Sequence, residues 1–188
     1  MGKRLLTCIV LIAIICSSAA VQAGYRRELS KATEMGRIYH PNDWNAELIW
    51  HATFFNKHFR DAFIKQHEKI KRIDPINAER FETEQMHRQV SGWDFLIVMY
   101  TREQYKSFSV YDDSFWRIEL ITADGEAVKP LSIEMLPITP YEERMFPFID
   151  RWSKAYRVTF PKVPLRDEVE LTMKSVVGES TLEWKVKQ

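Results

Sequence analysis

Apolar and polar side chains alternate along ELIWHATFF, residues 47–55, and this period of two is typical of a β-strand. The segment is also rich in Ile, Trp, Thr and Phe, which pack well on a pleated sheet. A strand here places four side chains on a common face: Leu48, Trp50, Ala52 and Phe54. A helix that runs straight on from Asp43 is the alternative interpretation of the same residues.

The period becomes helical after Asn56, whose side chain is typical of a helix N-cap. Apolar residues then recur every three or four positions, and the pattern predicts an amphipathic helix over residues 57–72. A shorter helix is expected upstream, over residues 26–35, because Gly36 suits a helix C-terminus. The chain is therefore expected to pass from helix to strand and back to helix.

Asp74 and Pro75 predict the start of a second helix, because aspartate caps a first turn and the fixed φ of proline suits it. This helix is expected to run from 75 to about 90 and to end at Gly92. Its candidates for inward-facing side chains include Ile76, Phe81 and Val90. The two helices together predict a helical hairpin over about residues 57–91.

From Trp93 to Tyr100 the chain is a mostly apolar run with the composition of a strand. Turn residues at 123–126 and 178–179 divide the later part of the chain into short segments. Further strands are expected at 115–122, 127–136, 154–160, 167–174 and 180–186. We therefore predict an α+β fold: an antiparallel immunoglobulin-like β-sandwich, mainly over 93–186, with the helical hairpin before or within it.

The first 23 residues have the three parts of a secretory signal peptide. Lys3 and Arg4 form the positive region, and about 11 mostly apolar residues follow, short of the ~20 that a membrane-spanning helix needs. Small residues then lead to Ala23, after which cleavage is expected. The sequence therefore predicts a signal peptide over 1–23 and a single domain over 24–188, exported to the periplasm.

Two alternatives keep the chain at a membrane: an uncleaved signal that acts as an anchor, and a lipid attached to Cys16. Lipid attachment requires a small residue before the cysteine, and Ile15 is large. Cleavage after Ala23 would remove Cys16 and Cys8, the two cysteines of the chain. The exported domain would then contain neither a disulfide nor a thiol and would depend on its apolar core.

The charge of the chain is close to balanced, with a formal net charge of +1. The predicted signal holds two of the 27 Lys and Arg residues and none of the 26 acidic ones, so the exported domain carries about −1. Such a domain creates no field that would steer nucleic acid or an anionic membrane toward it. Nucleic acid is therefore not expected as a partner, and a membrane would be reached only through the N-terminal segment.

Residues with catalytic or metal-binding chemistry form no recognisable motif in this sequence. His-x-x-x-His spacing is absent among the five histidines: His40, His51, His58, His67 and His87. The isolated glycines build neither a phosphate-binding loop nor a Gly-x-Ser-x-Gly elbow. We therefore predict no catalytic residue, metal or cofactor. The alternative is a hydrolase or metal-dependent enzyme that assembles its site in the fold from His51, Asp112, Asp113 and Glu142.

Two features are candidate binding surfaces. The first helix of the hairpin has a net charge of about +4 and the second about −2, which indicates mutual attraction within the hairpin. The alternative is a basic docking face that contains Lys65, Lys69 and Arg72. The second feature is the aromatic segment 146–152, which caps the sandwich if it is buried. If it is exposed, it marks a partner site through Phe146, Phe148 and Trp152.

A resemblance to known proteins is carried by five stretches: ELIWHATFF, FRDAF, FWRIEL, FPFIDRWSKAYRVTFP and LEWKV. Over about residues 32–186 the chain resembles a group of small exported bacterial proteins of unassigned function. The resemblance implies export to a Gram-negative envelope and a β-sandwich with a helical hairpin, but no activity and no functional residue. Members are often lipid-anchored, which keeps Cys16 as an alternative.

The absence of catalytic motifs and the aromatic-rich β region together favour a non-enzymatic function. The sequence predicts an envelope protein that binds another protein or has a structural or assembly role. Binding of a small ligand or lipid in an aromatic-lined cleft is a further alternative to the enzyme.

Overall fold

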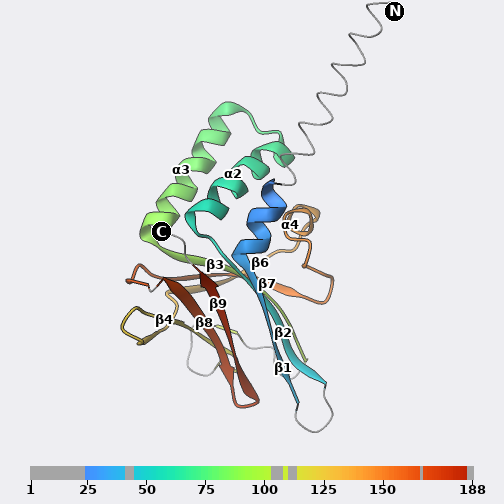
Figure 1. The fold of residues 1–188 in the computed structure, drawn as a ribbon. Helices are drawn as coiled ribbons and strands as arrows, with labels where there is room; N and C mark the ends of the chain where they lie inside the picture. The colour runs from blue at the N-terminus through green and yellow to red at the C-terminus, as the bar shows by residue number, and fades with distance from the viewer. Residues whose placement is uncertain (1–23, 41–44, 103–107, 110–113, 166, 186–188) are drawn as a thin grey trace, which may run out of the picture.

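The computed structural model describes residues 24–40, 45–102, 108–109, 114–165 and 167–185. Within these ranges four helices and nine strands form an α+β fold with two antiparallel sheets (Figure 1). In spatial order, the five-stranded sheet contains β1 (Thr33–Tyr39), β2 (Ala46–Phe54), β3 (Gly92–Thr101), β7 (Lys154–Pro161) and β6 (Ser132–Leu136). The four-stranded sheet contains β5 (Ala127–Val128), β4 (Arg117–Ile121), β8 (Glu168–Ser175) and β9 (Gly178–Lys185).

The two sheets share one apolar core. Strand β2 contributes the four side chains that the alternation predicts, and all of them are buried: Leu48, Trp50, Ala52 and Phe54. The helical alternative for this segment is wrong, because the segment forms antiparallel pairs with both β1 and β3. The opposite sheet contributes buried side chains from β4, β8 and β9, among them Leu120, Leu171 and Trp184. The alternation in the sequence therefore identifies the buried face correctly.

Two indole hydrogen bonds help to join β9 to the five-stranded sheet. Trp50 Nε1 donates to Ser180 Oγ on β9 over 3.1 Å. Trp184 Nε1 donates to the carbonyl oxygen of Ala32 over 2.9 Å, just before β1 begins. Because these donors are buried or half-buried, pairing them avoids the free-energy cost of an unsatisfied polar group.

The helices lie on the other face of the five-stranded sheet, here called the helix-side face (Figure 1). The N-terminal helix covers residues 24–32. Between β2 and β3 the chain forms a hairpin of α2 (Lys57–Lys71) and α3 (Pro75–Ser91), and α4 (Pro140–Met145) precedes β7. Asn56 caps α2 and Asp74 caps α3, as the sequence predicts. A second apolar cluster forms where these helices contact the sheet.

The inward face predicted for α3 is wrong in part. Ile76 and Val90 are exposed, and Phe81 is half-buried. The buried residue of α3 is instead Gln85, whose side-chain oxygen accepts from Arg60 on α2. Because α3 buries few apolar side chains, this polar contact helps to anchor it.

Three predicted boundaries also differ from the structure. The helix expected over 26–35 ends at residue 32, and Gly36 lies within β1. The strand expected over 127–136 divides into β5 and β6, which join different sheets, because Pro130 lacks the N–H of a continuous ladder. The turn expected at 178–179 falls two residues earlier, at 176–177.

Candidate functional site

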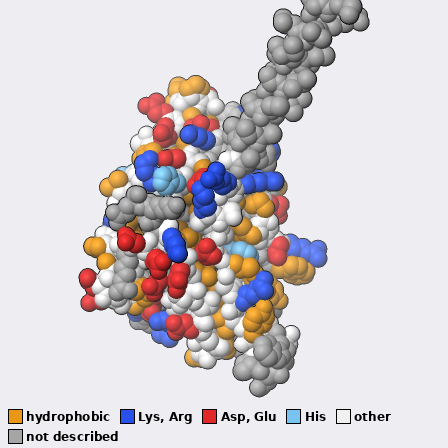
Figure 2. Space-filling view, in the orientation of Figure 1, with side chains coloured by type: hydrophobic (Ala, Val, Ile, Leu, Met, Phe, Trp, Pro, Cys, Tyr) orange, Lys and Arg blue, Asp and Glu red, His pale blue; other side chains and the backbone are white. Residues whose placement is uncertain are grey.

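The helices cover one end of the helix-side face and leave the other end open (Figure 1). At this open end lies a groove of about 450 Å³. Strands β2 and β3 provide its floor through Ile49, His51, Val98 and Tyr100. The loop between α4 and β7 provides the rest of its lining through Phe148, Asp150, Trp152 and Ser153. Figure 2 shows exposed hydrophobic side chains among basic ones over this part of the molecule.

The loop that lines the groove is held in place from both ends. Phe146 and Ile149 are buried in the cluster beneath the helices. Oδ1 of Asp150 accepts from the backbone N–H groups of Trp152 and Ser153, at 2.8 and 2.9 Å, and from the Ser153 hydroxyl. Burial raises the pKa of Asp150, but these hydrogen bonds and the charge of Arg151 lower it more. A carboxylate thus fixes the turn that presents Trp152 to solvent.

Aromatic groups form the centre of the groove. The His51 ring stacks on Phe148, with a centroid distance of 4.8 Å and an interplanar angle of 18°. Burial lowers the pKa of His51, the charge of Arg37 lowers it further, and Asp150 raises it in part. Near neutral pH His51 is therefore a neutral ring. Trp152 is 66% exposed and Tyr100 is 40% exposed.

Two cations lie beside these rings. Arg37 donates to the Tyr39 hydroxyl over 3.3 Å and lies 3.6 Å from the sulfur of Met35. The Arg151 guanidinium lies 4.8 Å from the centre of the Trp152 ring. The groove is therefore an aromatic surface with basic groups near it, and one acid, Asp150, whose Oδ1 is already engaged.

The aromatic segment predicted over 146–152 is divided by the fold. Phe146 is buried beneath the helices, Phe148 is half-buried in the groove, and Trp152 is exposed. The buried part packs against the helix-side face rather than capping the sandwich. The basic candidates Lys65, Lys69 and Arg72 are exposed and do not line the groove.

The candidate enzyme residues do not meet in the described ranges. His51 lines the groove, whereas Glu142 caps α4 through Thr139 and lines a different cavity. Asp112 and Asp113 lie outside the described residues. In the described part of the chain no group of three His, Cys, Asp or Glu side chains is placed to hold a metal ion.

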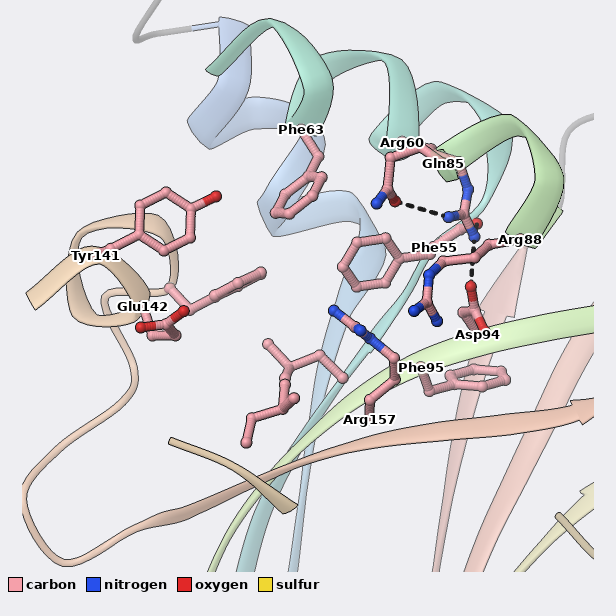
Figure 3. Close-up of a pocket in the computed structure, with 13 residues that line it drawn as sticks. Phe55, Arg60, Phe63, Gln85, Arg88, Asp94, Phe95, Tyr141, Glu142 and Arg157 are labelled. Carbon is pink, nitrogen blue, oxygen red and sulfur yellow. Dashed lines mark hydrogen bonds and ion pairs between the residues drawn. The ribbon is translucent and has the colours of Figure 1, made fainter. Parts of the chain in front are cut away.

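That different cavity lies between the helices and the helix-side face and has a volume of about 70 Å³ (Figure 3). Its wall contains the side chain of Arg60, which is only 1% exposed. Arg60 donates to Asp94 and to Gln85, each over 3.0 Å, and to the carbonyl oxygen of Phe55 over 3.3 Å. Thr159 donates to the other oxygen of Asp94. Both carboxylate oxygens of Asp94 therefore accept hydrogen bonds, and Asp94 forms an ion pair with the buried guanidinium of Arg60.

Sequence reasoning missed most of these lining residues. From the sequence, Arg60 is only one of the positive charges of the first helix, and its burial is not predicted. Helix α4 was also missed, although Thr139-Pro140-Tyr141-Glu142 is the sequence signature of a capping box, which the structure forms. Arg157 within the apolar run KAYRVTF was a second signal, because a strand rarely carries a lone charge toward a covered face.

Comparisons of the chain with family models, with curated proteins and with solved structures return no match. Among the described helices none combines the length and apolar character that a membrane crossing requires. The groove and the cavity are therefore assigned from geometry and chemistry alone.

Proposed function

We propose that this protein is a non-enzymatic module of the bacterial envelope that binds a partner protein through the groove beside Trp152. The observation that carries this proposal is a rigid loop that holds a tryptophan 66% exposed above an open aromatic groove. Large exposed aromatic side chains are costly in water and are enriched at interface hot spots. A fixed loop adds to affinity, because little conformational freedom is lost on binding.

The chemistry of the groove favours one kind of occupant: an extended segment with an aromatic or aliphatic side chain between carboxylates. The apolar side chain would lie on His51, Tyr100 and Trp152, which offer ring faces and edges. Carboxylates on either side would meet Arg37, whose charge acts on His51, and Arg151, which lies over Trp152. The hydrogen-bonded Asp150 would disfavour an acid placed directly over the turn.

The test uses synthetic peptides with a central Phe or Trp, flanked by glutamates in one series and by lysines in the other. We expect the acidic series to bind with the lower Kd, measured by fluorescence anisotropy. Trp152→Ala is expected to weaken binding at least about tenfold, which corresponds to about 1.4 kcal/mol. Val176→Ala is the matched control, because it removes an exposed apolar side chain away from the groove and should leave Kd unchanged.

Two results would contradict binding of a partner in the groove. Equal binding by wild-type protein and Trp152→Ala would show that the groove is not the site. Loss of binding in a Lys65→Glu, Lys69→Glu, Arg72→Glu variant, with Trp152→Ala unaffected, would place the docking face on α2 instead.

Export and the finer fold class also belong to this proposal. Cleavage after Ala23 is supported by the position of Tyr25, which is buried and whose hydroxyl donates to the carbonyl oxygen of Met145, because a residue two positions after the predicted site then belongs to the folded domain. Mass measurement of the purified chain distinguishes this periplasmic form from an uncleaved anchor and from a lipid on Cys16. The immunoglobulin-like assignment is supported by two facing antiparallel sheets with one core.

A further inference from the structure

The cavity beneath the helical hairpin has the composition of a site for an organic anion. Most of its lining is apolar or aromatic: Phe55, Phe63, Phe95, Leu96, Leu136, Tyr141 and Phe146. Its charged lining consists of three arginines and two acids: Arg60, Arg88, Arg157, Asp94 and Glu142. Such a wall, mostly hydrophobic with a few polar groups, is typical of a small-molecule pocket.

Two of the arginines that line the cavity come from different elements and are close enough for the charge of one to act on the other. Arg88 on α3 and Arg157 on β7 both extend their guanidinium groups into the cavity (Figure 3). Burial lowers the pKa of Arg157, and the charge of Arg88 lowers it further. In the described part of the chain, no side chain forms a hydrogen bond or ion pair with Arg157. Two like charges held together in a partly dry space are costly unless an anion joins them.

None of the nearby acidic side chains joins Arg88 to Arg157 in the described part of the chain. Asp94 is engaged by Arg60 and Thr159, and Glu142 accepts from Thr139 at the start of α4. Glu84 accepts from Nε of Arg88 over 3.2 Å, which leaves the two terminal nitrogens of Arg88 available. 

Glu134 is the other acid to consider, because it is the register partner of Arg157 on β6. It is exposed, and its charge raises the pKa of Arg157 in part, as do those of Asp94 and Glu84. No hydrogen bond joins Glu134 to Arg157 within the described residues. The arginine therefore keeps its donors for a ligand.

We propose that this cavity binds a small monocarboxylate with a compact apolar or aromatic body, and that Arg88 and Arg157 together hold the carboxylate. Planar guanidinium groups match a carboxylate through paired hydrogen bonds. The apolar body would lie against Phe55, Phe63 and Phe146.

Charge and size select this class of ligand. The lining carries one more positive than negative group, which suits a monoanion better than a phosphate dianion that would also meet Asp94 and Glu142. A single water needs roughly 10–15 Å³ of such space, so about 70 Å³ accommodates a group of several heavy atoms and not a long lipid chain. The Arg88 side chain is 30% exposed, so the site reaches solvent beside α3.

The test is calorimetric titration of the full chain with benzoate, with its neutral analogue benzamide and with inorganic phosphate. We expect saturable one-site binding of benzoate, weaker binding of phosphate and none of benzamide. Arg157→Gln and Arg88→Gln are each expected to weaken benzoate binding at least about tenfold. Arg80→Gln is the matched control, because Arg80 is an exposed arginine of α3 that does not line the cavity.

Several outcomes would overturn the inference. These are no saturable binding of benzoate, phenylacetate or isobutyrate up to about 10 mM, equal binding of benzamide, tighter binding of phosphate, or unchanged binding in both arginine variants. The Arg88 side chain is partly exposed, so Arg88→Gln keeps the test decisive if Arg157→Gln does not fold. Trp152→Ala should leave benzoate binding unchanged, which separates this inference from the proposed peptide site.

Discussion

Gly36 lies beside the hydrogen bond that joins Trp50 to Ser180 across the two sheets. A Cβ at this position would be 2.3 Å from Trp50 Nε1 and 2.4 Å from Ser180 Oγ. Real side chains do not approach so closely, so a larger residue here must displace the indole or the serine. The glycine is thus required by close packing within a strand, not by the helix terminus that its sequence context suggests.

We predict that Gly36→Ala destabilises the protein by about 1–3 kcal/mol, because it overpacks the contact and breaks the indole hydrogen bond. Urea unfolding followed by tryptophan fluorescence measures the change. Gly24→Ala is the control, since nothing lies within 4 Å of an added Cβ there, and it should have little effect. Equal stability of Gly36→Ala and wild-type protein would contradict the packing argument.

At the scale of elements, a buried ion pair attaches α2 to β3. Arg60 and Asp94 are 3.0 Å apart with side chains 1% and 6% exposed. The same guanidinium also reaches α3 through Gln85, so one residue connects both helices of the hairpin to the sheet. Nε of Arg60 has no partner within the described residues, which adds to the free-energy cost of its burial. The hairpin is therefore positioned by polar contacts as well as by its apolar face.

Removing one partner of this pair should be costly, because it leaves the other charge buried. We predict that Asp94→Ala lowers the free energy of unfolding by about 3–5 kcal/mol. The double variant Arg60→Met, Asp94→Leu should recover much of that loss, because an apolar pair needs no desolvated charge. Asp61→Ala, which breaks the exposed pair with Lys57, should cost less than about 1 kcal/mol in the same chemical denaturation experiment.

At the scale of the whole molecule, the helices cover only part of the helix-side face, and this determines where the two candidate binding sites lie. The helices cover one end of the helix-side face and leave the open groove at the other, with the anion cavity beneath the hairpin. Two histidines mark these regions: His51 in the groove, and His67 on α2, stacked on Phe81 at 3.7 Å and hydrogen-bonded to Tyr141. Because the fold lowers the pKa of both histidines, their protonation changes the free energy of unfolding.

We predict that stability falls as the pH is lowered below about 7. Burial lowers the pKa of His51 and of His67 below the ordinary value of 6.5, with Arg37 and Lys71 adding to the respective shifts. In this range the unfolded chain binds protons that the folded chain does not, so unfolding becomes more favourable until the lowered pKa values are passed. Asp150 also has a lowered pKa, but it titrates from the ordinary value of 3.8 downward and affects only more acidic solutions.

The measurement is urea unfolding at several pH values between about 5 and 8. Wild-type protein should lose stability toward the acid end. A His51→Gln, His67→Gln variant should show a flatter profile, whatever its stability at pH 8. An equally steep profile in the variant would mean that other groups cause the pH dependence.

Local sequence determines much of this protein. The alternation in β2, the caps at Asn56 and Asp74 and the apolar run of β3 each specify an element, because periodicity and capping act between near neighbours. The exposure of Trp152 was one of two outcomes that the sequence left open. From the sequence, segment 146–152 is expected to cap the sandwich if it is buried. Phe146 and Ile149 instead pack beneath the helices on the helix-side face.

Only the tertiary structure decided which charges are buried and which face stays open. Arg60 carries a charge that usually stays at the surface, and it becomes buried because Asp94 and Gln85, distant in sequence, meet it from β3 and α3. Arg157 faces a cavity because the hairpin inserted between β2 and β3 folds over β7. Both outcomes depend on where the helical layer ends over the sheet, and that position is set by long-range packing that no local pattern encodes.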